Sequence, residues 1–181
     1  MPHADGENGP SAPDTADHEI ARLVRGAQRG DRAAFAELYQ RFTRMVHGIV
    51  LARATRTDVD DLVQDVFVTA LERLMDLREP AAFGGWLAAI ARHRATDHGR
   101  RQPMTEALVN DVPSPKQSDR LEALAILAAI KSLPDAYSET LVLRLVEGMT
   151  GAEISDRTGL TPASVRVNLH RGMKLLREKL T

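Results

Sequence analysis

The chain has 181 residues, of which 43% are hydrophobic and 4% aromatic, and its formal net charge is −1. This length allows one ordinary domain or two small ones, and the near-neutral charge excludes a global field that attracts nucleic acid. There is no cysteine, which excludes disulfides, thiolate zinc sites and cysteine catalysis. Few aromatic residues and many Ala, Leu, Arg and Glu favour helices over strands.

No apolar run approaches the length that spans a membrane, and residues 1–11 lack the basic and apolar segments of a signal peptide. We therefore expect a cytoplasmic protein without a membrane partner.

Two segments hold little to bury. Residues 1–17 are rich in Pro, Gly, Ala and Asp and predict a disordered tail. Residues 102–119 contain three prolines and little periodicity, which predicts a flexible linker. The remaining ranges, 18–101 and 120–181, carry helical periodicity and no strand pattern. The sequence thus predicts an all-α protein of two small helical domains.

The first domain is predicted to hold four helices. Gly30 ends the first, and Asp31 caps the second. The third begins at "TDVDD" (57–61), where Thr57 and Asp60 have the spacing of a capping box. Residues 78–85 are predicted as a loop, followed by a fourth helix whose buried side includes Trp86.

The second domain predicts a helix-turn-helix. Before it come a helix closed by Pro134 and a second helix with Leu141, Val142 and Leu145 inward. The short helix at about 151–158 begins with a Thr150–Glu153 capping box and ends at Gly159 in left-handed conformation. Thr161 and Pro162 then start a helix over about 162–179. A tight turn between two such helices is typical of DNA-binding modules.

The last of these helices is basic. Residues 162–180 carry five basic residues against one acid, a local charge of +4. An inward stripe of Val165, Leu169, Leu176 and Leu180 leaves the other faces free for phosphates and base edges. A solvated helix face is the plainer interpretation of the basic residues alone. The predicted DNA contacts are Thr161, Ser164, Arg166, Val167, Asn168, His170, Arg171 and Lys174.

Charge is also segregated in the first domain. Residues 57–72 hold five acids and no Lys or Arg, whereas residues 92–101 hold four arginines and one acid, Asp97. Each could be a solvated face, and the arginines could pair with the acidic helix. Two basic sites on a tether suit one partner with two separated contacts.

Three stretches together resemble a bacterial RNA polymerase sigma factor of the extracytoplasmic-function type, which has only regions two and four. They are "DVDDLVQDVFVTALERL", "FGGWLAAIARHRATDHGRR" and "LPDAYSETLVLRLVEGMTGAEISDRTGLTPASVRVNLHRGMKLLREKL". The resemblance covers about 20–101 and 120–180.

The resemblance implies partners and site residues. Region two would bind the clamp of the largest subunit of core RNA polymerase through Asp60, Asp61, Gln64 and Asp65. The minus-ten promoter element would be engaged and melted by Trp86, Arg92, His93, Arg94, Asp97, Arg100 and Arg101. The loop at 78–85 would sit where the family pockets an unstacked base. Region four would contact the polymerase flap and read the minus-thirty-five element, and an anti-sigma protein often holds such factors inactive. No cofactor and no catalytic activity are implied.

Other interpretations stay open at this stage. His93, Asp97 and His98 have a spacing from which a zinc site could be built. A transcription regulator with an N-terminal sensor domain would carry the same helix-turn-helix. Trp86 is also the kind of residue that packs in a core.

Overall fold

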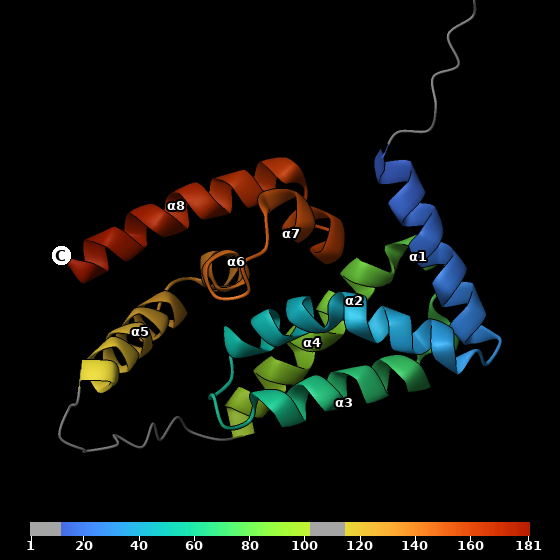
Figure 1. Cartoon of the computed structure of the whole chain (residues 1–181), viewed down its shortest axis with the longest axis horizontal. Helices are drawn as coiled ribbons and strands as arrows, with labels where there is room; N and C mark the ends of the chain where they lie inside the picture. Colours follow the sequence, from blue (N-terminus) through green and yellow to red (C-terminus); the bar gives the residue numbers. More distant parts are fainter. Residues whose placement is uncertain (1–11, 102–114) are drawn as a thin grey trace, which may run out of the picture.

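The computed structural model describes residues 12–101 and 115–181, and within them every regular element is a helix (Figure 1). This confirms the all-α prediction. The elements in chain order are α1 (Ala12–Gln28), α2 (Arg32–Leu51), α3 (Val59–Glu72), η1 (Leu74–Asp76), η2 (Pro80–Ala82), α4 (Phe83–Arg101), α5 (Pro115–Lys131), α6 (Asp135–Leu145), α7 (Gly151–Thr158) and α8 (Pro162–Leu180).

Helices α1–α4, called here the N-terminal unit, pack around α2, which contacts each of the other three. Gly30 adopts a φ of 91°, which lets the chain reverse after α1. The Asp31 carboxylate then accepts hydrogen bonds from the backbone N–H groups of Ala33 and Ala34, at 2.9 and 3.2 Å. Both turn predictions are therefore confirmed, and they place α2 for burial of Leu38 and Phe42.

Two helices begin earlier than the sequence suggests. Helix α1 starts inside the predicted tail 1–17, and α5 starts inside the predicted linker 102–119. In each case a proline, Pro13 or Pro115, stands in the first turn, where its fixed φ and missing N–H suit a helix. Residues 1–11 and 102–114, the rest of these two predictions, lie outside the described residues.

The predicted capping box at Thr57 and Asp60 is wrong. Helix α3 starts at Val59, and its N-cap Asp58 makes no side-chain cap hydrogen bond. The Asp58 carboxylate instead accepts hydrogen bonds from the hydroxyls of Thr55 and Thr57. The carboxylate of Asp58 is therefore bonded to the threonines of the preceding turn and does not cap the backbone N–H groups of α3.

The loop predicted over 78–85 is shorter than expected. Pro80–Ala82 form a 3₁₀ turn, and α4 already begins at Phe83. Phe83 is fully buried, and its ring meets that of Phe42 edge-on with centroids 5.1 Å apart. Burial of the Phe83 ring thus accompanies the inclusion of residues 83–85 in α4.

Helices α5–α8, the C-terminal unit, contain the predicted helix-turn-helix. Thr150 and Glu153 form both bonds of the capping box, and Gly159 has a φ of 75°. The Thr161 hydroxyl accepts from the N–H of Ser164 at 3.1 Å. These local predictions are confirmed, and they orient α8 across α6.

The inward placement of Leu145 and Leu180 is wrong, because their side chains are 49% and 52% exposed. Each residue closes its helix, where the neighbouring helices no longer cover the apolar face. Periodicity identifies a face but does not show how far along it the packing extends.

The two units pack against each other where α6 and α7 meet α2 and α4, a contact called here the seam (Figure 1). Two glycines allow the close approach. A Cβ on Gly48 would lie 2.6 Å from Leu143 Cδ2, and one on Gly84 would lie 2.5 Å from the Arg157 carbonyl oxygen. At Gly84 the obstacle is backbone, so a larger residue there must move α7 away from α4, whereas at Gly48 the side chain of Leu143 or Glu147 would have to move.

Candidate nucleic-acid interface

Helix α8 presents a basic face to solvent. Val165 and Leu176 are 2% and 4% exposed and anchor the helix on its inner side. Gly172 lies against Tyr137 and Leu141, where an added Cβ would come within 3.2 Å of both side chains. The outward face consists of Arg166, Val167, His170, Arg171 and Lys174, all exposed. These side chains are therefore free to meet a nucleic-acid groove.

The other predicted contacts of α8 lie at its start or on its flank. Thr161 and Ser164 share a hydrogen bond between their hydroxyls at 2.8 Å, at the exposed N-terminus of the helix. Asn168 is half-buried, and its Nδ2 donates to Thr140 Oγ1 on α6 at 3.4 Å. Asn168 thus faces the protein more than the other predicted residues do.

Helix α4 carries the second group of predicted contacts. Trp86 is partly buried, with its ring centroid 5.9 Å from that of Phe83. His93 and Arg100 are exposed, and Arg94 is exposed while its Nη2 donates to Thr69 Oγ1 at 2.7 Å. The Arg101 side chain lies outside the described residues.

Arg92 differs from its neighbours because its guanidinium is held by Glu139 of α6, with Nη2 and Oε1 2.8 Å apart. This hydrogen bond raises the pKa of Arg92. The partner is a carboxylate across the seam, and not the acidic helix α3 that the sequence suggested as an alternative.

The acidic residues predicted on α3 do form one surface. Asp60, Asp61, Gln64 and Asp65 are all exposed. Sequence analysis missed the apolar residues that extend this surface along α3 and beside it, namely Tyr39, Val68, Leu71 and Met75, which are 39%, 55%, 53% and 72% exposed. The available signal was spacing, since Val68 follows Gln64 by four residues and so lies on the same helix face.

Comparisons with known proteins match two separate parts of the chain. Residues 38–103 match Sigma-70 region 2, and residues 123–176 match Sigma-70, region 4. The RNA polymerase sigma factor NccH of Alcaligenes xylosoxydans xylosoxydans is 32% identical over 178 residues, which cover 88% of this chain and 91% of NccH. This chain belongs to the sigma-70 family of RNA polymerase sigma factors.

Further similarities narrow the type. The ECF RNA polymerase sigma-E factor of Haemophilus influenzae is 28% identical over 177 residues, covering 87% of this chain and 93% of that factor. The structure of CnrH in complex with the cytosolic domain of CnrY matches with a TM-score of 0.64 and 26% identity, covering 90% of this chain and 97% of that one. The protein is thus a sigma factor of the extracytoplasmic-function type.

A sigma factor binds core RNA polymerase and promoter DNA and directs promoter recognition and transcription initiation. The match to region 4 contains α7 and residues 162–176 of α8, and the match to region 2 contains α3 and α4. This excludes the alternative of a regulator with an N-terminal sensor domain.

The alternative metal site does not form. His98 Nε2 lies 2.9 Å from an oxygen of Asp58, whereas His93 Nδ1 pairs with Asp97 at 3.1 Å. The two imidazoles therefore serve different carboxylates. Among the residues that the structure describes, no three His, Cys, Asp or Glu side chains gather where they could hold a metal ion. Among the same residues, no helix is long and apolar enough to cross a membrane.

One ion pair across the seam makes stability depend on pH. His47 Nδ1 of α2 lies 2.6 Å from Glu147 Oε1, just after α6. This hydrogen bond raises the pKa of His47 above its ordinary value, against the opposing effect of burial and with a further contribution from Asp60. Arg44 and Arg56 are the basic groups nearby.

We expect the sigma factor to lose stability as pH rises through the raised pKa of His47. A raised pKa in the folded state stabilises that state below the unfolded value near 6.5, and the gain disappears once His47 is neutral. Thermal unfolding midpoints measured between pH 5.5 and 8.5 check this. His47→Asn should flatten this part of the profile, and an unchanged profile would contradict the assignment.

Proposed function

We propose that this sigma factor divides its work among three surfaces. The α3 surface, Asp60, Asp61, Gln64 and Asp65 with Val68 and Leu71, docks on the clamp of core polymerase. The α4 surface holds the minus-ten element as it melts, and its residues are Trp86, Arg92, His93, Arg94, Asp97, Arg100 and Arg101. The outer face of α8 reads the minus-thirty-five element, and region four also contacts the flap.

The sorting of charge by position supports this proposal. The exposed face of α3 is acidic and apolar, which suits a protein partner, and the outer face of α8 is basic, which suits phosphates. The proposed boundaries are residues 18–101 for region two, 102–119 for the linker and 120–181 for region four. The chain catalyses no reaction itself and works in the cytoplasm, where it redirects the polymerase.

Replacing Arg166 and Arg171 by alanine should weaken promoter binding by the polymerase complex. Each lost base or phosphate contact contributes about 1–3 kcal/mol, so a loss of about tenfold or more is expected. The salt dependence of binding should also become shallower, by about one for each lost phosphate contact. Both quantities come from binding titrations on duplex promoter DNA at several salt concentrations.

Lys179→Ala is the matched control, because Lys179 is an exposed basic residue of α8 outside the proposed contacts. Binding of core polymerase should be unchanged in Arg166→Ala, in Arg171→Ala and in Lys179→Ala. Equal losses in Lys179→Ala would mean that general positive charge, and not the proposed face, carries the interaction.

Transcription in vitro tests the function as a whole. Core polymerase with this chain should initiate at discrete start sites, and mapping them would reveal the promoter elements. The isolated chain should bind the same DNA poorly. If the chain gave no more specific initiation than core polymerase alone, the proposed function would be wrong.

A further partner is proposed from the similarity to CnrH, whose solved structure contains the cytosolic domain of CnrY. The exposed apolar residues Val68, Leu71 and Met75 offer a surface that an anti-sigma protein would cover. Such a partner should compete with core polymerase for the α3 surface, which a competition binding assay measures.

A further inference from the structure

The carboxylate of Glu139 lies buried at the seam. The residue belongs to α6 and is 3% exposed. It accepts hydrogen bonds from Arg92 Nε at 3.0 Å and Arg92 Nη2 at 2.8 Å, and Arg53 Nη2 lies 2.9 Å from it. Arg92 belongs to α4 and Arg53 follows α2. All of these contacts therefore join the C-terminal unit to the N-terminal unit.

The contact with Glu139 removes Arg92 from the surface proposed for the minus-ten element. The carboxylate of Glu139 occupies the Nε and Nη2 donors of Arg92. These are the two donors that would otherwise form a bidentate pair of hydrogen bonds with a phosphate. The negative charge of Glu139 also repels a phosphate that approaches Arg92. The other arginines of α4 that the structure describes, Arg94 and Arg100, remain exposed.

A buried ion pair of this kind suits a reversible contact. Two arginines and a carboxylate lose much of their hydration when buried, and their mutual attraction roughly compensates for this loss. The arrangement is therefore specific without being strongly stabilising, while removal of one partner leaves a buried charge unpaired. A closed seam held in this way can open when a partner favours the open form.

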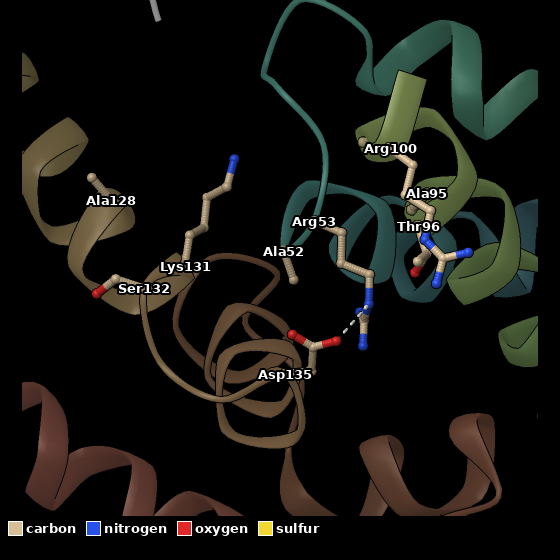
Figure 2. Close-up of a pocket in the computed structure, with 10 residues that line it drawn as sticks. Ala52, Arg53, Ala95, Thr96, Arg100, Ala128, Lys131, Ser132 and Asp135 are labelled. Carbon is tan, nitrogen blue, oxygen red and sulfur yellow. Dashed lines mark ion pairs between the residues drawn. The ribbon is translucent and has the colours of Figure 1, made fainter. Parts of the chain in front are cut away.

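The remainder of the seam is mixed and partly open. Arg157 Nη1 donates to the Arg41 carbonyl at 2.8 Å, and Lys131 Nζ donates to the Ala54 carbonyl at 2.5 Å. Lys131 and Arg53 also line a cleft of about 360 Å³. Figure 2 shows residues of α4 on one side of the cleft and residues of α5 on the other, with Arg53 turned toward Asp135. Polar interfaces of this type between domains permit relative movement.

We propose that the closed arrangement is an autoinhibited state of the sigma factor, in which Glu139 is a latch that keeps Arg92 from promoter DNA. The inference rests on the proposed role of α4 at the minus-ten element. Core polymerase, which binds both units in the proposed function, shifts the population toward the open form because it favours separated units.

Fluorescence energy transfer in the free chain measures the opening. The sequence has no cysteine, so Glu72→Cys on α3 and Glu178→Cys on α8 provide the only two labelling sites. In this background Glu139→Gln should lower the transfer efficiency, because a neutral amide cannot balance both guanidinium groups. Glu122→Gln, an exposed glutamate of α5, is the matched control and should change nothing. Unchanged efficiency in Glu139→Gln overturns the latch.

Single-stranded DNA binding by the free chain measures the masking. A labelled oligonucleotide of random sequence should bind the Glu139→Gln variant about fivefold more tightly than the wild-type chain, since apparent affinity follows the fraction of open molecules. Adding Arg92→Ala should remove this gain. Opening without any gain in DNA binding would overturn the claim that closure masks Arg92.

A covalent lock gives a test that does not depend on the stability of a Glu139 variant. An added Cβ at Gly48 lies 3.5 Å from Leu143 Cγ, which is within reach of a disulfide between Gly48→Cys and Leu143→Cys. The oxidised double variant should lose at least tenfold in transcription with core polymerase, and a reductant should restore it. The cysteine-free wild-type chain serves as the control for the reductant.

The two proposals fail in different ways. A wild-type chain that does not initiate with core polymerase removes the proposed function, whatever the energy transfer shows. A wild-type chain that initiates, together with an oxidised lock that initiates equally well, leaves the proposed function in place and overturns the latch.

Discussion

Phe83→Ala is expected to lower the free energy of unfolding by about 3–5 kcal/mol, the usual loss when a buried phenylalanine is truncated. Phe83 is fully buried at the start of α4. It contacts the rings of Phe42 and Trp86, with centroids 5.1 and 5.9 Å away. Alanine would leave a cavity in the middle of the N-terminal unit. The chain has a single tryptophan, so the fluorescence of Trp86 reports denaturant unfolding directly.

Leu71→Ala is the matched control for this truncation. Leu71 is also a large apolar residue of the N-terminal unit, but it is 53% exposed, so its loss should change stability by only about 0.5 kcal/mol. The same variant should weaken core polymerase binding if the α3 surface docks as proposed. A cost below about 1 kcal/mol for Phe83→Ala would contradict the packing at the start of α4.

The features that sequence predicted best are those set by neighbouring residues. The capping box of Thr150 and Glu153 and the left-handed Gly159 depend only on residues within one turn, and both are confirmed. These two caps fix where α7 begins and ends, and the helix-turn-helix follows from them together with Thr161, which caps the start of α8. The predicted Thr57–Asp60 capping box does not form, because the hydroxyl of Thr57 donates to the neighbouring carboxylate of Asp58, as does that of Thr55.

The seam could not be predicted in this way. Glu139 and Arg92 are 47 residues apart, and no periodicity connects an acid on one helix with an arginine on another. Gly48 and Gly84 likewise looked like ordinary glycines of a helix and a loop. Only the structure shows that Leu143 approaches Gly48 and that the Arg157 carbonyl approaches Gly84 too closely for a larger side chain.

Exposure of apolar residues was equally hard to predict. Leu71 continues the apolar stripe of α3, and Leu145 continues that of α6, yet both are about half exposed, at 53% and 49%. A helix face is buried only as far as its neighbours reach. Residues beyond that point remain available for partners, which is why the surface proposed for core polymerase contains leucine and valine beside the aspartates.

The closed arrangement treats the three proposed surfaces differently. The outer faces of α3 and α8 stay accessible in the closed arrangement, whereas Arg92 of α4 does not. If both proposals hold, polymerase and duplex DNA bind first, and the minus-ten contact is completed only after the units separate. This order limits unproductive binding of single strands by the free factor.

Asp61→Arg together with Asp65→Arg is expected to weaken binding of core polymerase by about 100-fold or more. Both residues are exposed on α3, and neither forms an ion pair within the described part of the chain, so the free protein should lose little. A basic partner surface would instead face two arginines, and like charges brought together at an interface cost several kcal/mol. Titration of labelled sigma factor with core polymerase measures the effect.

The matched control, Asp17→Arg with Asp156→Arg, makes the same change in net charge on exposed positions of α1 and α7. It should leave polymerase binding within about twofold, because charges beyond a Debye length of about 10 Å are screened. Circular dichroism must show intact helices, since arginine in the first turn of α3 opposes the helix dipole by about 0.3–1 kcal/mol. If the α3 pair impaired binding of duplex DNA by α8 as strongly as polymerase binding, the two surfaces would not be separate. With intact helices, this result would contradict the division of labour, because a charge reversal on α3 that leaves the structure unchanged does not alter the outer face of α8.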